Sequence, residues 1–331
     1  MCDLYIGLVS AGPQVGLGHV VRTTAVLEAL GQRGNQVCLL VEERGAPFNP
    51  DCCTINHDMV RVETCTTEEV SRAISEIASG RTSILLTDVP EAEVFDHSAA
   101  RSLGCEYTVC LNAHQPVVTH VDLAFLRGYT WEIDQELPAY IRTGAEFESV
   151  HERVREIRPS EPWSGGEVNS VLITLGTADP GLLTEDVAIE AIPRFDEVDI
   201  VVGPLFDPNR EKTLSKLSSQ NTTVHVAPNN LPSLILDAEF VVSLGGQTAY
   251  EAMCLGRPVA GVRWGPVERA VDFHVQNGLM FDLGERDKVG MGLSLARLSP
   301  KLLQQIASSG WSCIDGNGAE RMATEILALF E

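Results

Sequence analysis

The sequence predicts an α/β protein with two Rossmann-like domains, each built around a parallel β-sheet. The chain has 331 residues, more than the roughly 100–200 residues of a usual single domain. Short, almost continuously apolar runs alternate with helical segments, which is typical of a parallel sheet covered by helices on both faces. The alternation stops in the charged stretch 128–166 and then starts again, so this stretch is interpreted as the connection between the domains.

The order of apolar and helical segments predicts the elements. Strands of the first domain are expected at 4–9, 37–41, 59–63, 83–88, 107–112 and 121–126, with helices at 19–33, at 67–78 and from residue 89 to about residue 103. Strands of the second domain are expected at 170–176, 198–203, 223–227, 239–246 and 258–262, with helices that end near Ile192 and Leu255, a short helix after residue 227 and a last helix at about 317–330.

The domain boundaries follow from this pattern. An N-terminal domain is expected at 1–150 and a C-terminal domain at 151–315. The final segment, 316–331, is expected to form a helix that can return across the junction between them.

The charge and the N-terminus limit the possible partners. The formal net charge is −22, from 46 acidic and 24 basic residues, whereas proteins that bind nucleic acid usually have a basic face. No apolar run approaches the roughly 20 residues that span a bilayer, and Asp3 lies where a signal peptide would be positively charged. We therefore expect a soluble, cytoplasmic protein that binds neither nucleic acid nor membranes.

Cysteine and histidine spacing predicts no metal site, and no bound cofactor is expected. The chain has nine cysteines and eight histidines, without a C-x-x-C pair or an H-x-x-x-H pair on a predicted helix. Zinc sites usually space their ligands in such patterns. The cysteines are interpreted as reduced structural thiols.

The first candidate site lies between the first strand and the first helix. Gly16 and Gly18 allow a tight turn and a close approach of the backbone to a ligand. His19 and Arg22 follow at the carboxyl edge of the sheet, where open α/β sheets bind ligands. An imidazole there can act as a general base near neutral pH. The alternative is that the glycines only form a turn and that His19 caps the helix or packs.

The second candidate site lies where the strand at 239–246 meets a helix. Gly245 and Gly246 end the strand, and Gln247 and Thr248 begin the helix, whose free N–H groups form an anion site suited to a diphosphate. Glu251 lies one helical turn after Gln247, so both side chains point the same way, and its carboxylate can accept hydrogen bonds from two ribose hydroxyls. The alternative is a plain strand–turn–helix with a solvated glutamate.

Two weaker candidates lie at the same predicted sheet edge. Gly176 and Thr177 end the first strand of the second domain and offer backbone and a hydroxyl to a ligand. Asp179, just before Pro180, is expected to cap the following helix. Asn229 and Leu231 lie in a loop after a strand, where they could hold the edge of a nucleobase.

Four segments together carry a family resemblance: GLGHVVRTTAVLEAL, VLITLGTADPGLLTEDV, SLGGQTAYEAMCLGRPV and IDGNGAERMATEIL. They resemble the GT-B group of glycosyltransferases and, within it, the UDP-sugar hydrolases of pseudaminic acid biosynthesis. The resemblance implies a GT-B fold with a nucleotide-sugar cleft between the domains. It also implies that the residue matching His19 is the base, and that Gly245 and Gly246 with Glu251 hold UDP.

The resemblance is stronger around UDP than around the sugar. The hydrolases carry an Arg-x-Asp segment where this chain has 8–11, an Asn-Gln pair where it has Glu268 and its neighbours, and an aspartate pair near Leu111 and Asn112. We therefore expect a metal-independent glycosyltransferase that takes a UDP-sugar and a small acceptor, with a nucleobase or a natural-product fragment both open as the acceptor. A UDP-sugar hydrolase is the close alternative, followed by a UDP-sugar epimerase and a non-catalytic nucleotide-binding protein. The oligomeric state stays open.

Overall fold

The computed structural model describes residues 4–45, 58–63, 66–90, 105–113, 120–126 and 137–330. The chain forms two compact units. Unit 1 comprises Met1–His151 and Asn317–Glu331, and unit 2 comprises Glu152–Gly316. The boundaries expected from the sequence, after residues 150 and 315, lie next to these. Each unit is described by itself.

Unit 1 contains a seven-stranded sheet in the order β3-β2-β1-β4-β5-β6-β7, and all its strand pairs are parallel. The strands are β1 (Leu4–Ala11), β2 (Val37–Glu43), β3 (Asp58–Val62), β4 (Ser83–Asp88), β5 (Cys105–Ala113), β6 (Leu123–Leu126) and β7 (Ile141–Arg142). All eight residues of the central strand β1 are buried, as its continuous apolar sequence predicts for a strand covered on both faces.

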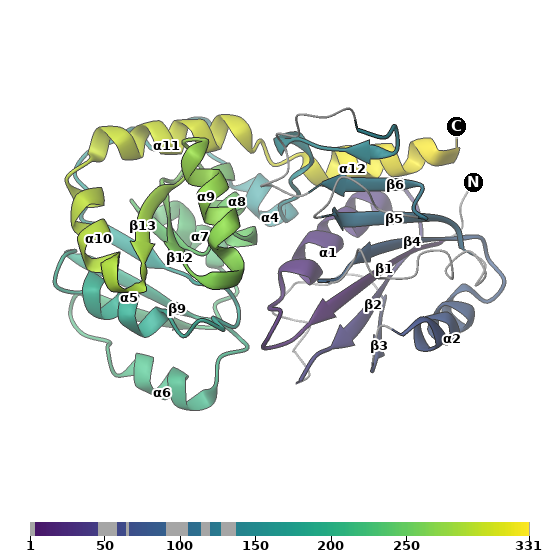
Figure 1. The fold of residues 1–331 in the computed structure, drawn as a ribbon, viewed down its shortest axis with the longest axis horizontal. Coiled ribbons are helices and arrows are strands. Elements are labelled where there is room, and N and C mark those ends of the chain that lie inside the picture. Colours follow the sequence, from purple (N-terminus) through teal and green to yellow (C-terminus); the bar gives the residue numbers. More distant parts are fainter. Residues whose placement is uncertain are drawn as a thin grey trace. The chain divides into compact units, whose positions relative to one another are not determined.

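The described helices of unit 1 are α1 (Gly18–Gly31), α2 (Thr67–Ala78) and α12 (Gly318–Leu327), with short 3₁₀ turns at Ala145–Phe147 and Ala328–Phe330. The last helix, α12, belongs to unit 1 and packs against α1 (Figure 1). Two ion pairs tie it down, Arg33 Nη2 to Glu320 at 3.0 Å and Arg142 Nε to Glu325 at 2.5 Å. The C-terminal segment thus returns to the first domain.

Unit 2 contains a six-stranded parallel sheet in the order β10-β9-β8-β11-β12-β13. The strands are β8 (Ser170–Ile173), β9 (Glu197–Val202), β10 (Thr222–Val226), β11 (Val241–Ser243), β12 (Val259–Arg263) and β13 (Phe281–Glu285). Two parallel sheets with crossover helices confirm the predicted fold class.

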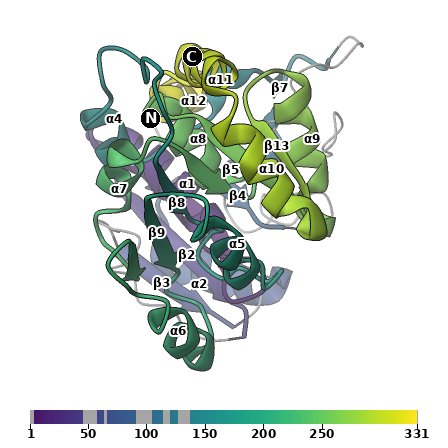
Figure 2. The same ribbon diagram turned by 90° about the vertical axis from the view of Figure 1, so that its left-hand side faces the viewer.

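The helices of unit 2 are α4 (Glu152–Glu156), α5 (Thr184–Ala191), α6 (Pro208–Ser215), α7 (Leu231–Asp237), α8 (Gln247–Cys254), α9 (Glu268–Gln276), α10 (Val289–Arg297) and α11 (Pro300–Cys313), with 3₁₀ turns at Gly265–Val267 and Arg286–Lys288. Helix α5 packs against α10 (Figure 2), while α8 packs against α4, α7 and α11. The core is mostly aliphatic, and the rings of Phe195 and Phe240 stack in it with their centroids 6.3 Å apart.

Several sequence expectations need correction. The stretch 128–166 is more than a connection, because its described part from residue 137 adds β7 to unit 1. The strands expected at 170–176 and 239–246 are shorter, because glycine turns end them at Ile173 and Ser243. No element was expected between residues 263 and 316, where β13 lacks an apolar run because it contains Asp282, Gly284 and Glu285. The helix expected up to about residue 103 lies outside the described residues after Pro90.

Within the described ranges, no helix combines the length and the apolar character that a membrane span requires.

Candidate functional site

In both sheets the strand order reverses at one point. In unit 1 the chain moves from β1 outward to β2 and β3 and then restarts at β4, which lies on the other side of β1. In unit 2 the same reversal separates β8 from β11. Ligands of open α/β sheets bind outside the carboxyl ends of the strands at this switch point. The first, second and third candidate sites all follow one of these four strands.

His19 lies at the switch point of unit 1, as the second residue of α1. Its Nδ1 atom is 2.7 Å from Oδ1 of Asp88, the last residue of β4, and the imidazole is 15% exposed. Before it, the loop closes on itself, because Gly16 N–H donates to the Gly12 carbonyl at 2.7 Å and Gly16 has a φ of 72°. Gly18 begins the helix. The glycine turn thus brings the histidine to the end of the neighbouring strand.

Asp88 is fully buried and accepts hydrogen bonds from three side chains. Besides His19, Arg22 donates from Nε at 2.7 Å and from Nη2 at 2.5 Å, and Thr23 Oγ1 donates at 3.1 Å. Burial opposes ionisation of Asp88, but the Arg22 guanidinium and the hydrogen bonds from His19 and Arg22 outweigh it and hold the pKa of the carboxyl well below its ordinary value. Asp88 is therefore a carboxylate at neutral pH.

This carboxylate selects the tautomer of His19. If Nδ1 carries the proton it donates to Asp88 at 2.7 Å, whereas an unprotonated Nδ1 would accept from Arg22 Nη2 at 3.1 Å. The shorter contact to an ionised acceptor favours the proton on Nδ1. The lone pair then lies on Nε2, which is the atom that can take a proton from a substrate. Arg22, proposed from sequence as a ligand-binding residue, is only 5% exposed and acts here on Asp88.

In unit 2 the glycine turn after β11 leads directly into α8. Gly245 has a φ of 74°, a left-handed conformation that favours glycine. Gly246 is the N-cap residue of α8, so the N-cap position provides no capping side chain. A Cβ on Gly246 would meet no heavy atom within 4 Å, so the backbone is open on that side. Gln247 and Thr248 form the first turn, which contains no acidic residue. This helix start suits an anion.

Glu251 lies one turn further along α8 and is 8% exposed. Its carboxylate has no hydrogen bond or ion pair with a described residue, and burial raises its pKa to about 7. A buried carboxyl group without a partner costs stability when it is ionised. An incoming ligand with hydroxyl donors would provide the missing partners.

The loop after β8 is held rigidly. Gly176 has a φ of 88° with open space at its Cβ position, and the Thr177 carbonyl accepts from Leu205 N–H at 2.9 Å. Gly203, after β9, approaches Thr177 so closely that a Cβ would lie 2.3 Å from the Thr177 carbonyl oxygen. The backbone at Gly176 is thus fixed beside β11 at the sheet edge.

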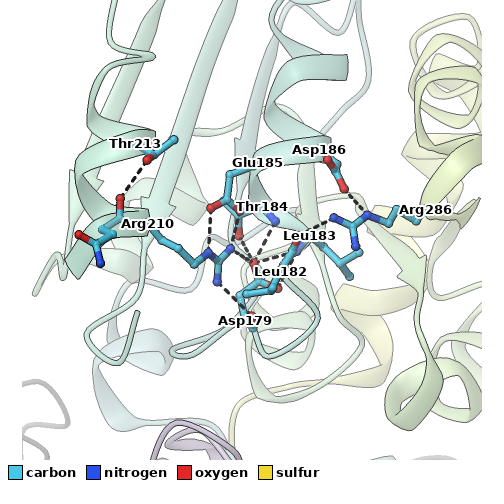
Figure 3. A network of polar contacts seen from close by, with 10 residues as sticks. Asp179, Leu182, Leu183, Thr184, Glu185, Asp186, Arg210, Thr213 and Arg286 are labelled. Carbon is cyan, nitrogen blue, oxygen red and sulfur yellow. Dashed lines mark hydrogen bonds and ion pairs between the residues drawn. The ribbon is translucent and has the colours of Figure 1, made fainter. Parts of the chain in front are cut away.

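Asp179 bonds the start of the following helix, as expected for a cap, but that helix does not begin at Pro180. Helix α5 begins later, at Thr184, and the buried Asp179 carboxylate reaches forward to Leu183 N–H at 3.0 Å and Thr184 N–H at 2.9 Å (Figure 3). Arg210 Nη2 donates to the same carboxylate at 2.7 Å and also pairs with Glu185. This network closes the loop onto α5 and accounts for Asp179 structurally.

The structure brings only part of the fourth candidate site, Asn229 and Leu231, near the other candidate sites. Asn229 follows β10, the outermost strand, which β9 and β8 separate from β11. Leu231 begins α7, which packs against α8. Strand neighbours therefore do not place Asn229 next to the glycine turn, although the same edge of the sheet carries both.

Two residues of the site were missed from the sequence. Asp88 ends the apolar run SILLTD, and a carboxylate at the carboxyl end of the strand beside β1 is the signal that could have identified it. His274 on α9 is fully buried, and its Nε2 lies 3.2 Å from the Gly245 carbonyl oxygen. No local pattern relates it to the glycine turn, which lies 29 residues earlier.

Comparisons with known proteins agree on the fold. No protein-family model matches the sequence. A curated relative, an uncharacterised protein of Methanocaldococcus jannaschii, is 31% identical over 98 residues, which are 28% of this chain and 20% of the relative's own length. The chain thus covers only a fifth of that protein.

Solved structures match over nearly the whole chain. They include UDP-GlcNAc 2-epimerase from Neisseria meningitidis bound to UDP-GlcNAc (TM-score 0.66, 12% identity, 98% of this chain and 100% of the other). They also include MurG from Acinetobacter baumannii (0.60, 15%, 98% and 99%) and the calicheamicin glycosyltransferase CalG4 (0.63, 15%, 99% and 98%). At these identities the likeness shows the fold: the chain has the GT-B architecture of two Rossmann-like units.

The first prediction concerns Asp88→Asn. Removing one partner of a buried ion pair typically costs about 3–5 kcal/mol, because Arg22 keeps its charge without a compensating carboxylate. The pKa of Asp88 is lowered in the folded protein, so its contribution is present above the ordinary value of about 3.9 and is lost as the pH falls below it. Urea unfolding followed by circular dichroism should show a lower free energy of unfolding for Asp88→Asn than for the wild type at pH 7, and a smaller difference at pH 3.

The matched control is Asp196→Asn, whose exposed carboxylate lies 3.9 Å from Arg297. Exposed pairs contribute about 0–1 kcal/mol, so this variant should unfold like the wild type. Equal stability of Asp88→Asn and Asp196→Asn at pH 7 would show that the Asp88 network is not a stabilising ion pair.

Proposed function

We propose that the protein is a glycosyltransferase that moves the sugar of a UDP-sugar to a small acceptor, with His19 as the general base. The observation that carries the proposal is Glu251, a buried carboxyl group without a described partner, one turn behind an open glycine turn and a helix start whose N-cap residue is a glycine. This arrangement combines an anion site with an acceptor of hydroxyl hydrogen bonds. A nucleoside diphosphate carries the two matching groups, an anionic diphosphate and ribose hydroxyls.

In this proposal unit 2 holds the UDP portion. The N–H groups of Gly246, Gln247 and Thr248 receive the diphosphate at the positive end of α8, and Glu251 accepts from the ribose hydroxyls. Gly245 allows the turn. Further contacts are proposed for the other residues at the same edge of the sheet, namely Gly176, Thr177, Asn229 and Leu231.

Unit 1 supplies the base. Nε2 of His19 takes the proton from the hydroxyl or amine of the acceptor, whose lone pair forms the new bond to the anomeric carbon. The bond from that carbon to the UDP oxygen breaks, and UDP leaves with the electron pair. The helix start of α8 stabilises the charge that develops on the diphosphate. The imidazolium that forms is stabilised by Asp88 through Nδ1. Gly16, Gly18 and Arg22 keep His19 and Asp88 in place.

The similar structures support a nucleotide-sugar enzyme but include both transferases and epimerases. Product analysis by mass spectrometry distinguishes the reactions. The protein is incubated with UDP-sugars, with and without small acceptors. A sugar–acceptor conjugate with released UDP is the expected result. Free sugar would indicate the hydrolase, an isomeric UDP-sugar the epimerase, and an unchanged UDP-sugar a binding protein, and each of these would overturn the transferase assignment.

A second prediction is that activity does not require a divalent metal. Helix starts can stabilise the leaving diphosphate, and the sequence has no Asp-x-Asp motif. Among the residues that the structure describes, no three His, Cys, Asp or Glu side chains are grouped for metal binding. Turnover should be the same with and without EDTA. A loss in EDTA that magnesium or manganese restores would contradict this expectation.

A further inference from the structure

His274 lies behind the glycine turn and contacts it directly. The side chain is fully buried on α9, and its Nε2 lies 3.2 Å from the carbonyl oxygen of Gly245. A carbonyl oxygen can only accept, so Nε2 carries the proton and donates. The ring is held by Tyr250 of α8, which meets it edge-on with centroids 5.2 Å apart. The donor is therefore fixed in position and not free to rotate toward solvent.

The same face of α9 also contacts Gly245 through a second residue, Val271. Val271 lies three residues before His274, so both side chains project from one face of the helix. A Cβ on Gly245 would lie 3.3 Å from Val271 Cγ2 and 3.4 Å from the Val271 backbone nitrogen. Helix α9 thus supports the turn by packing at Val271 and by a hydrogen bond at His274.

Fixing the carbonyl of Gly245 also fixes the N–H of Gly246. The two groups belong to one planar peptide unit, and in a trans peptide they point in opposite directions. No described peptide bond is cis. Because the carbonyl points toward His274, the N–H of Gly246 points away from α9. It donates to no described residue, and the space at the Gly246 Cβ position is open.

We infer that His274 is a positioning residue for the diphosphate, which aims the Gly246 N–H at the anion by holding the Gly245 carbonyl; this rests on the proposed function. Without the donor, the peptide between Gly245 and Gly246 can rotate, since both neighbouring residues are glycines. The N–H would then lose its fixed direction. Contacts of Glu251 with a ribose lie on the helix itself and do not depend on this peptide.

The test compares UDP with uridine, which lacks the phosphates, by isothermal titration of three variants. His274→Leu removes the donor, His274→Asn is too short to place its amide at the position of Nε2, and His274→Gln reaches that position. UDP affinity should fall about tenfold in the Leu and Asn variants, as expected for losing one charge-assisted hydrogen bond, and should largely return in the Gln variant. Uridine affinity should stay within about twofold in all three.

Equal losses for UDP and uridine would make His274 merely structural, and wild-type UDP affinity in His274→Leu or His274→Asn would overturn the inference. If the Leu variant does not fold, the comparison of Asn with Gln decides the question, because both are polar amides of similar character. A wild-type protein that binds neither ligand would overturn the proposed function and the inference with it, and this result is distinct from the other outcomes.

Discussion

His19→Asn is expected to lower turnover by about 10²–10⁴-fold, the usual contribution of a general base. The asparagine amide can still donate to Asp88 from near the position of Nδ1, so the buried network with Arg22 and Thr23 stays satisfied. What is lost is the lone pair on Nε2, which takes the proton of the attacking group. UDP affinity should stay within about twofold, because the proposed nucleotide contacts lie in unit 2. Initial rates and calorimetric titrations with UDP measure the two quantities separately.

The matched control is His225→Asn, which removes a half-buried histidine paired with Asp199 at 2.7 Å in unit 2, away from both switch points. Its turnover should match the wild type. Near-normal turnover in His19→Asn would contradict the catalytic assignment. A parallel loss of UDP affinity and rate would instead make His19 a phosphate ligand.

Glu251→Gln is expected to weaken UDP binding and to stabilise the free protein at the same time. Removing a charged acceptor of ribose hydrogen bonds should cost roughly 1.5–3 kcal/mol of binding free energy. In the free protein, burial raises the pKa of this carboxyl from 4.5 to about 7, which corresponds to roughly 3 kcal/mol of lost stability once the group is ionised. Glutamine avoids that cost.

The sign of the pH dependence follows from the raised pKa. The wild type has its full stability below about pH 4.5 and loses the contribution of Glu251 as the pH rises through about 7. The free energy of unfolding of Glu251→Gln relative to the wild type should therefore increase by roughly 2–3 kcal/mol between pH 5 and pH 8. The control Glu285→Gln, at an exposed position, should show no such trend. A Glu251→Gln variant that is less stable at pH 8 and binds UDP normally would make Glu251 a structural residue.

Much of the fold could be predicted from the sequence because strands buried on both faces leave continuous apolar runs. β1 and β4 are such runs, and both were placed within two residues of their ends. β13 was not expected, because an edge strand with Asp282 and Gly284 has no such run. β7 was not expected either, because its two residues, Ile141 and Arg142, are too few to show a hydrophobic periodicity.

The candidate site, like the fold, could be predicted from the sequence only in part. Gly245, Gly246 and Glu251 are close in sequence, so their spacing alone predicts one turn and one helix start. The partner of His19 is 69 residues away and the donor to Gly245 is 29 residues away. These contacts depend on which strands become neighbours and on how α9 packs, which a local pattern does not contain. Asp179 shows both cases in one residue: its position before Pro180 predicted a helix cap, and its carboxylate does bond the start of α5, but the bond to Arg210, 31 residues away, is not contained in that local pattern.

The central claim, a nucleoside diphosphate site in unit 2, is tested most directly by thermal and calorimetric titration with UDP, with AMP and NAD as comparisons. UDP should bind, and at a free concentration of 100 times its dissociation constant it should raise the free energy of unfolding by about 2.7 kcal/mol. AMP and NAD should bind more weakly and stabilise less at the same concentration. A protein whose melting temperature and heat signal ignore UDP at millimolar concentration, or respond equally to AMP, would contradict the account.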